Sequence, residues 1–233
     1  MPALSLALLT VAGFAASVLN ILAGGGSFFT LPLLIFLGLP AAEANATSRV
    51  GVVAQNVSGV VAFHRHGVMD WVFSRSALLP TVVGAALGSW GALYVSDRDF
   101  RRVLAVVMLV MTLFTLADPA RWRLKLEGGV RATVSFVGFL LVGIYGGFIQ
   151  AGVGFLHLAL ASMLGLDLVR GNAVKVLLVL VQTLVSLAIF TFSGKVAWAP
   201  GLALAVGSVL GGYVGVHLTV LKGHAWIQRF VTV

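Results

Sequence analysis

Long apolar runs alternate with short polar segments along almost the whole chain. Two of these runs, 27–39 and 154–166, would be only about 20 Å long as helices, too short to cross a hydrocarbon core of about 30 Å. The other runs are mostly close to the roughly 20 residues that a crossing helix needs. They cover residues 3–23, 48–63, 77–95, 102–117, 130–150, 174–193 and 197–221. The pattern predicts seven membrane-spanning helices and two half-helices or re-entrant segments.

The pattern repeats after 127 residues without a gap, so the chain consists of two similar units. The matching pairs include Gly25 and Gly152, Phe28 and Phe155, Asn45 and Asn172, Gln55 and Gln182, Trp71 and Trp198, and Gly88 and Gly215. We therefore divide the chain into a first membrane unit (1–117), a connecting loop (118–129) and a second membrane unit (130–233). We expect the second unit to lack its final helix, because the chain ends where the first unit has the 102–117 helix.

The composition agrees with an all-α integral membrane protein, since 60% of residues are hydrophobic and 9% are charged. The net charge of +8 comes from basic residues that fall singly or in small groups between the apolar runs, which favours contact with lipid over nucleic acid. Cysteine is absent, so no thiolate metal site is predicted. The expected partners are the lipid bilayer and a small anion, with no nucleic acid and no cofactor; a homo-oligomer is left open.

The basic residues also predict the topology. If both short runs cross the membrane, ten basic residues lie on one side and five on the other, whereas short runs that return to the side they enter from give seven against eight. The positive-inside rule favours the arrangement in which both short runs cross the membrane. It gives the first unit five crossings, so the second unit is inverted, the N-terminus lies outside and the 118–129 loop lies in the cytoplasm. Inverted repeats with broken helices are a transporter layout, with the substrate site where the units meet.

A glycine-rich break precedes each short run. The first break is Gly24-Gly25-Gly26 and the second is Gly152-Val153-Gly154. A half-helix that starts at Ser27, with Ser27 as its N-cap, would aim its first amide groups and its positive dipole end at the break, an arrangement that binds oxyanions. The alternative is that the glycines only allow two helices to pack closely.

Polar residues follow each half-helix at matching positions. In the first unit these residues are Asn45, Thr47 and Ser48. Either Asn45 or Thr47 caps the next helix while Arg49 reaches the lipid headgroups, or the three side chains are ligands that converge on a substrate. Lys175 either attracts the anion or pairs with Asp167, and the two glutamines contact either other helices or the substrate. His157, at the position of Thr30, is either a buried donor or functional. The predicted substrate-binding residues are Gly24, Gly25, Gly26, Ser27, Asn45, Thr47, Ser48, Arg49, Gln55, Gly152, Gly154, His157, Asn172, Lys175 and Gln182.

Other classes of function find less support in the residues. No carboxylate lies deep in a long apolar run, which disfavours a cation pathway lined by acids. The sequence also offers no paired carboxylates, no cluster of metal ligands and no nucleophile with a base, so neither an enzyme nor a metal site is predicted. The stripes Gly84-x-x-x-Gly88 and Gly207-x-x-x-Gly211-x-x-x-Gly215 predict close helix packing.

The sequence resembles the sulfite exporter TauE/SafE family. The resemblance rests on Ala23-Gly24-Gly25-Gly26-Ser27-Phe28, then Pro32, Gly38 and Ala46-Thr47-Ser48, and on the glycine-rich second copy, which has no proline matching Pro32. It implies a multi-pass carrier of the inner membrane that exports sulfite, sulfoacetate or related small sulfur-containing or organic anions. The alternatives are an anion channel, a membrane-embedded enzyme acting on a lipid or sulfur substrate, and a structural scaffold.

Overall fold

The chain folds entirely into helices in the part that the computed structural model describes, residues 3–22, 24–116 and 128–232. Side chains are described except at 112, 114–116 and 222–232. The predicted all-α class is confirmed. Residues 118–127 of the predicted connecting loop lie outside the described residues, and residues 128–129 already belong to a helix. The helices are α1 (Ala3–Leu22), α2 (Ser27–Phe36), α3 (Ala41–Arg65), α4 (Trp71–Leu93), α5 (Asp97–Leu116), α6 (Gly128–Phe148), α7 (Val153–Met163), α8 (Leu168–Phe192) and α9 (Trp198–Thr232).

Five helices, α1, α4, α6, α8 and α9, are long and apolar enough to cross a membrane. The sequence predicted two more, which correspond to α3 and α5. With 25 residues α3 is as long as α8, but it carries Glu43, Arg49 and Arg65 and many uncharged polar residues. The first turns of α5 contain Asp97, Asp99 and three arginines. Charged and polar side chains, and not insufficient length, therefore separate these two helices from the other five.

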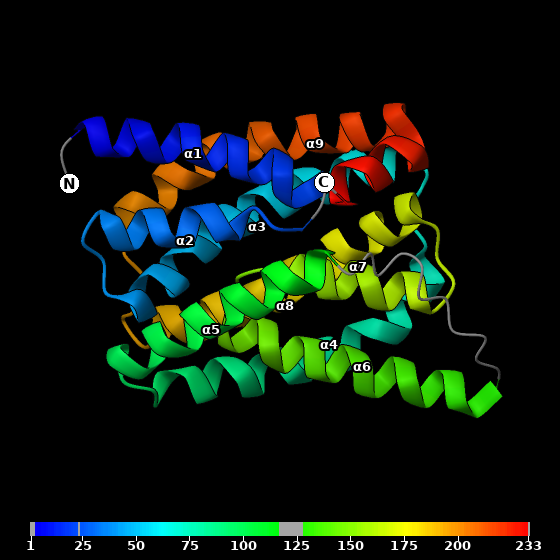
Figure 1. The fold of residues 1–233 in the computed structure, drawn as a ribbon, viewed down its shortest axis with the longest axis horizontal. Coiled ribbons are helices and arrows are strands. Elements are labelled where there is room, and N and C mark those ends of the chain that lie inside the picture. Colours follow the sequence, from blue (N-terminus) through cyan, green and yellow to red (C-terminus); the bar gives the residue numbers. More distant parts are fainter. Residues whose placement is uncertain (1–2, 23, 117–127, 233) are drawn as a thin grey trace.

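The fourth helices of the two units, α4 and α9, are exchanged between them. The second-unit helix α9 packs along α1 and α3, and the first-unit helix α4 packs along α6 and α8. Figure 1 shows α1 and α9 along one edge of the bundle and α4 and α6 along the opposite edge. The central helices α3 and α8 contact each other. Eight of the described helices therefore form two mixed halves, α1-α2-α3-α9 and α6-α7-α8-α4, which are joined through α3 and α8, and α5 packs against α3 and α9.

Each short helix turns back along the helix that precedes it. Leu9 in the first half of α1 shares a buried cluster with Leu34 and Leu39 at the end of α2. In the other unit Arg131 Nη2, near the start of α6, donates to the carbonyl of Leu164 just after α7 (2.7 Å). The chain thus leaves α2 on the face where α1 begins. This is what we expect if the short runs cross the membrane instead of returning to the side they enter from. The inversion of the units is compatible with this arrangement and stays a prediction.

Glycine stripes bring the outer helices into backbone contact. An added Cβ at Gly84 would lie 2.8 Å from the amide nitrogen of Ile144, and one at Gly207 would lie 2.8 Å from the amide nitrogen of Phe14. Real Cβ atoms do not approach backbone this closely. The predicted close packing is therefore found at the pairs α4 with α6 and α1 with α9, and any side chain at these positions would force the helices apart.

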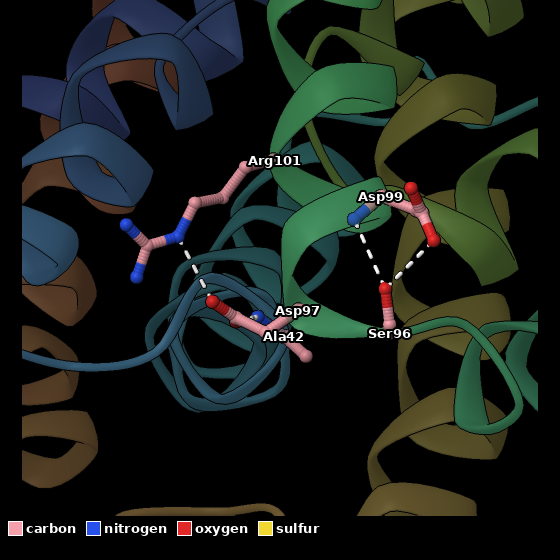
Figure 2. A network of polar contacts seen from close by, with 5 residues as sticks. All are labelled: Ala42, Ser96, Asp97, Asp99 and Arg101. Atoms are coloured by element: carbon pink, nitrogen blue, oxygen red, sulfur yellow. Dashed lines mark hydrogen bonds and ion pairs between the residues drawn. The ribbon is translucent and has the colours of Figure 1, made fainter.

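The start of α5 is attached to the start of α3 by a small polar network (Figure 2). Asp97 accepts hydrogen bonds from the backbone amide of Ala42 (3.1 Å) and from Arg101 Nε (2.9 Å). Ser96 Oγ donates to Asp99 (2.7 Å) and accepts from the Asp99 amide (3.2 Å), which caps the helix. Carboxylates in the first turn of a helix are stabilised by the positive end of the helix dipole. The network holds the start of α5 in place. Phe100 and Leu104 of α5 also share one buried cluster with Ile149, which lies just before the second glycine-rich break.

Candidate functional site

The two glycine breaks contact each other at the centre of the protein. Gly24 and Gly152 both adopt left-handed backbone conformations, with φ of 96° and 71°. An added Cβ at Gly24 would lie 2.6 Å from the carbonyl carbon of Gly154, and one at Gly154 would lie 2.8 Å from the Cα of Gly24. The breaks are therefore glycine-rich because two chain segments meet there backbone to backbone, and because one position in each needs a positive φ.

An aromatic ring from each half covers the break of the other half. The Phe155 ring would lie 2.6 Å from a Cβ at Gly25, and the Phe28 ring would lie 2.6 Å from a Cβ at Gly152. The two rings stack with their centroids 6.4 Å apart. Ser27 Oγ adds a polar link, since it donates to the carbonyl of Gln150 (3.1 Å) and accepts from the amide of Gly152 (3.2 Å). Ser27 therefore ties the breaks together and is not the predicted N-cap, a position that Gly26 takes.

Arg49 is fully buried and reaches from α3 to the end of α6. Its Nη1 donates to the carbonyl of Gly146 (3.1 Å) and to Gln150 Oε1 (2.8 Å), and its Nη2 donates to the carbonyl of Gly147 (2.7 Å). The guanidinium also lies 5.0 Å above the centre of the Phe190 ring. These acceptors are neutral, and Nε has no partner in the described structure. Arg49 therefore does not reach the headgroups, so this alternative is wrong.

Asn45 reinforces the same helix end. Its Nδ2 donates to the carbonyl of Phe148 (3.0 Å), and its Oδ1 accepts from the amide of Gln150 (3.0 Å). The carbonyls of a last helical turn have no amide partner within the helix. Asn45 lies in the second turn of α3, which begins at Ala41 with Pro40 before it, so neither Asn45 nor Thr47 caps this helix. The polar residues of α3 stabilise the end of another helix instead of the start of their own.

Lys175 donates hydrogen bonds to carbonyls at the end of α1, as Arg49 does at the end of α6. Its Nζ donates to the carbonyls of Asn20 (3.0 Å) and Ile21 (2.8 Å) and to Asn172 Oδ1 (2.6 Å). A cation at a helix C-terminus is favoured by the helix dipole. Asp167 is not its partner: the Asp167 carboxylate accepts from the amides that begin α8 and lies 3.6 Å from Arg170. The alternative of a Lys175–Asp167 ion pair is therefore wrong.

His157 and Gln182 form a second buried polar pair, with His157 Nε2 2.9 Å from Gln182 Oε1. The imidazole stacks on Phe139 at a centroid distance of 5.8 Å. His157 Nδ1 and Gln182 Nε2 have no hydrogen-bond partner among the described residues. The pair links α7 to α8, so the interhelical role considered for Gln182 is present, and each side chain retains one polar atom for another ligand.

The remaining predicted residues lie around these groups. Thr47 Oγ1 accepts from the amide of Ala197 just before α9, and Ser48 Oγ donates to the carbonyl of Asn45, both at 3.0 Å. Gln55 lines a small cavity with Ser48. Sequence reasoning left Gln150 out of the site, although its side chain is the acceptor of Arg49. Its place directly before the second break was the available signal.

The comparisons with known proteins agree with a membrane transporter. Residues 9–233 match the family described as sulfite exporter TauE/SafE. The chain is 28% identical to a "Probable membrane transporter protein" of Haemophilus influenzae, covering 98% of this chain and 90% of the relative. It is 29% identical to "Probable membrane transporter protein YfcA" of Escherichia coli (strain K12), covering 96% of this chain and 82% of the relative. It is 25% identical to "Probable membrane transporter protein ORF9" of a Sinorhizobium species, covering 98% and 88%.

No solved structure matches the chain. The relatives are named as transporters, and the apolar helices make this chain a multi-pass membrane protein. Because the family match extends over nearly the whole sequence, the chain belongs to the sulfite exporter TauE/SafE family.

Proposed function

We propose that the protein is a secondary transporter that exports small sulfur-containing or organic anions, such as sulfite or sulfoacetate, across the inner membrane. The substrate site lies where the two units, inverted relative to each other, meet. One observation carries the proposal: Arg49 and Lys175 are both buried, at 0% and 2% exposure, while none of the described carboxylates is buried. A membrane protein with two buried positive charges and no buried negative charge near them attracts anions to its interior.

The energetic cost of these cations supports the same reading. A charged side chain at the bilayer centre costs about 2.5–3.5 kcal/mol on insertion scales, unless water, a partner or a substrate compensates. The carbonyls that hold Arg49 and Lys175 offset part of this cost through their dipoles, but they leave the net charge in place. Arg49 Nε, Asn172 Nδ2 and Gln182 Nε2 are in addition buried donors without an acceptor in the described part of the chain. An anion bound near either cation would compensate its charge.

The test is transport by the purified protein in proteoliposomes. We expect uptake of sulfite or sulfoacetate to saturate with concentration, and an internal anion to accelerate it by counter-transport. Thiosulfate and simple carboxylates define the range of substrates in the same assay. Flux that rises linearly and shows no counter-transport would indicate an anion channel, and absence of flux for every anion would contradict the proposal.

A further inference from the structure

A small polar cavity lies within the half α1-α2-α3-α9, beside the first break. Its volume is about 10 Å³, about the room that one water molecule needs. The lining is neutral and rich in hydroxyl and amide groups. The polar side chains that line it are Ser17 and Asn20 of α1, Ser27 and Thr30 of α2, Ser48 and Gln55 of α3, and Ser208 of α9. All seven are buried, with Asn20 and Thr30 the most exposed at 8%.

Four of these side chains have no partner of their own. The side chains of Ser17, Asn20, Thr30 and Gln55 make no hydrogen bond to any residue in the described ranges. Other buried hydroxyls of this protein usually bond to a carbonyl, as Thr81 does to Ala77 and Thr219 to Gly215 (both 2.8 Å). An unpaired buried polar group costs about 1–3 kcal/mol. Four such groups around one cavity indicate that a ligand or water completes them.

The start of α2 faces the same cavity, because Gly26 and Ser27 are part of its lining. The amides of Phe28 and Phe29 already donate to the carbonyls of Gly25 and Gly26 (3.0 and 3.1 Å), so the contribution of α2 is the positive end of its dipole. Lys175 lies at the border of the cavity, since its ammonium group binds the carbonyl of Asn20, whose side chain lines the cavity. The cavity thus combines neutral donors with a positive field from two sides, which suits an oxyanion.

The matching positions in the other half differ in size and chemistry: Thr30, Ser48 and Gln55 correspond to His157, Lys175 and Gln182, and three smaller lining residues correspond to apolar side chains. Val153 stands where the first half has Gly26, and it packs with Val52 and Val179. Ile144 stands at the position of Ser17, and Leu178 at the position of Gly51. Leu178 is fully buried in an apolar cluster. These larger residues take up space that is open around Gly26 and Gly51 in the first half, and Ile144 replaces the hydroxyl of Ser17, so the two halves are not equivalent at this point.

We infer that the cavity in the first half is the oxyanion-binding site of the transporter, with Thr30, Gln55 and Ser208 in contact with the anion. The second half contributes the charge of Lys175. This inference rests on the proposed function and assigns the contacts within it. Since the cavity holds about one water molecule, binding of an anion the size of sulfite requires α2 or α9 to move outward.

The experiment measures sulfite binding by the full-length protein in detergent, by titration calorimetry. The variants are Thr30→Val, Gln55→Met and Ser208→Ala, which remove one polar group each from three different helices. The matched controls are Thr81→Val, at the first-unit position that corresponds to Ser208, and Thr219→Val. We expect the dissociation constant to rise about tenfold or more in each of the three cavity variants, and to stay within about twofold of the parent in the controls.

Two results would overturn the inference, and they differ in what else they affect. If the three cavity variants bind sulfite like the parent while Lys175→Gln binds it weakly, the anion function stands and the site lies elsewhere. If the parent binds neither sulfite, sulfoacetate nor thiosulfate, the proposed function fails together with the inference. The thermal unfolding of each variant without sulfite shows whether it is folded, and Ser208→Ala is the mildest change, because its hydroxyl makes only one long bond (3.4 Å to the carbonyl of Gly13).

Discussion

At the scale of single residues, the two buried cations have both a structural and an electrostatic effect. Each donates hydrogen bonds to carbonyls at the end of a helix from the other unit, and these acceptors carry no charge. The bonds are charge-assisted and therefore contribute more than neutral ones. Stability and anion attraction thus come from the same side chains, and a variant has to be measured for both.

Lys175→Gln is the sharpest test at this scale. We expect it to weaken sulfite binding and to make the remaining binding less sensitive to salt, because the neutral side chain removes the local attraction. We also expect the free energy of unfolding to fall by about 1.5–3 kcal/mol, the range for hydrogen bonds to a charged group. The control is Lys195→Gln, which removes an exposed lysine. Unchanged affinity with lowered stability would leave Lys175 with a structural role only.

Arg49→Gln separates the two cations. The Arg49 side chain makes three hydrogen bonds to Gly146, Gly147 and Gln150, and it does not line the cavity. We therefore expect a smaller loss of sulfite affinity than in Lys175→Gln, and a similar or larger loss of stability. Binding and thermal unfolding measured on both variants would check the order. An affinity loss larger than that of Lys175→Gln would move the centre of the anion site towards the end of α6.

The sequence identified these residues but not their contacts. Repetition at an interval of 127 residues pointed to Asn45, Asn172, Gln55 and Gln182, because uncharged polar residues at matching depths are rare in apolar runs. Their partners differ from residue to residue: Asn45 bonds to the backbone of Phe148 and Gln150, Asn172 accepts from Lys175, and Gln182 pairs with His157. No pattern of side chains reveals a carbonyl left free at a helix end. For this reason the predicted roles of Ser27 and Asn45 as helix caps were wrong.

At the scale of elements, the breaks are held by two different constraints. Gly152 needs both a positive φ and space next to the Phe28 ring, whereas Gly25 needs only space next to the Phe155 ring. A ring can be made smaller, but a left-handed backbone still costs an L-residue about 1–2 kcal/mol. The two breaks, similar in sequence, should therefore respond differently to the same change.

We expect Gly25→Ala and Gly152→Ala each to lower the stability and the transport rate. Each glycine variant is then combined with a smaller side chain in place of the ring it meets, Phe155→Leu with Gly25→Ala and Phe28→Leu with Gly152→Ala. Compared with the Phe155→Leu variant alone, the double variant that contains Gly25→Ala should lose little stability. Compared with the Phe28→Leu variant alone, the double variant that contains Gly152→Ala should lose more, because about 1–2 kcal/mol of backbone strain remains. Unfolding in detergent measures both cycles. Equal restoration in the two pairs would mean that the positive φ of Gly152 contributes nothing.

The glycine stripe of α4 contains its own control. Gly88→Ala places a Cβ against the backbone of Ile144 and Phe148, so we expect a loss of about 1–3 kcal/mol from overpacking. Gly91, in the same helix, has open space at its Cβ position. Gly91→Ala should therefore raise the stability slightly, by up to about 1 kcal/mol, because alanine favours the helix. Denaturant titration of both variants tests the contrast, and a neutral Gly88→Ala would mean that α4 and α6 can separate without cost.

At the scale of the whole molecule, the exchange of α4 and α9 binds the two units into one body. The repeat was visible in the sequence, but the exchange was not, because the interval of 127 residues shows which segments are alike and not which ones pack together. The contacts of α9 with α1 and α3 place residues from both units around the cavity, including Ser208. A variant in one unit can therefore change the binding surface of the other.

The orientation in the membrane is the prediction that belongs to the whole molecule. The helical hairpin α1-α2 returns the chain to the face where it began, and the first turns of α1 and α6 lie at opposite ends of the bundle (Figure 1). When the buried Arg49 and Lys175 are left out, the count predicted from the sequence becomes nine basic residues on one side of the membrane and four on the other. We therefore expect a periplasmic N-terminus and a cytoplasmic 118–129 loop. Reporter fusions before residue 3 and within 118–127 measure this, and two reporters active on the same side of the membrane would show that the units are not inverted.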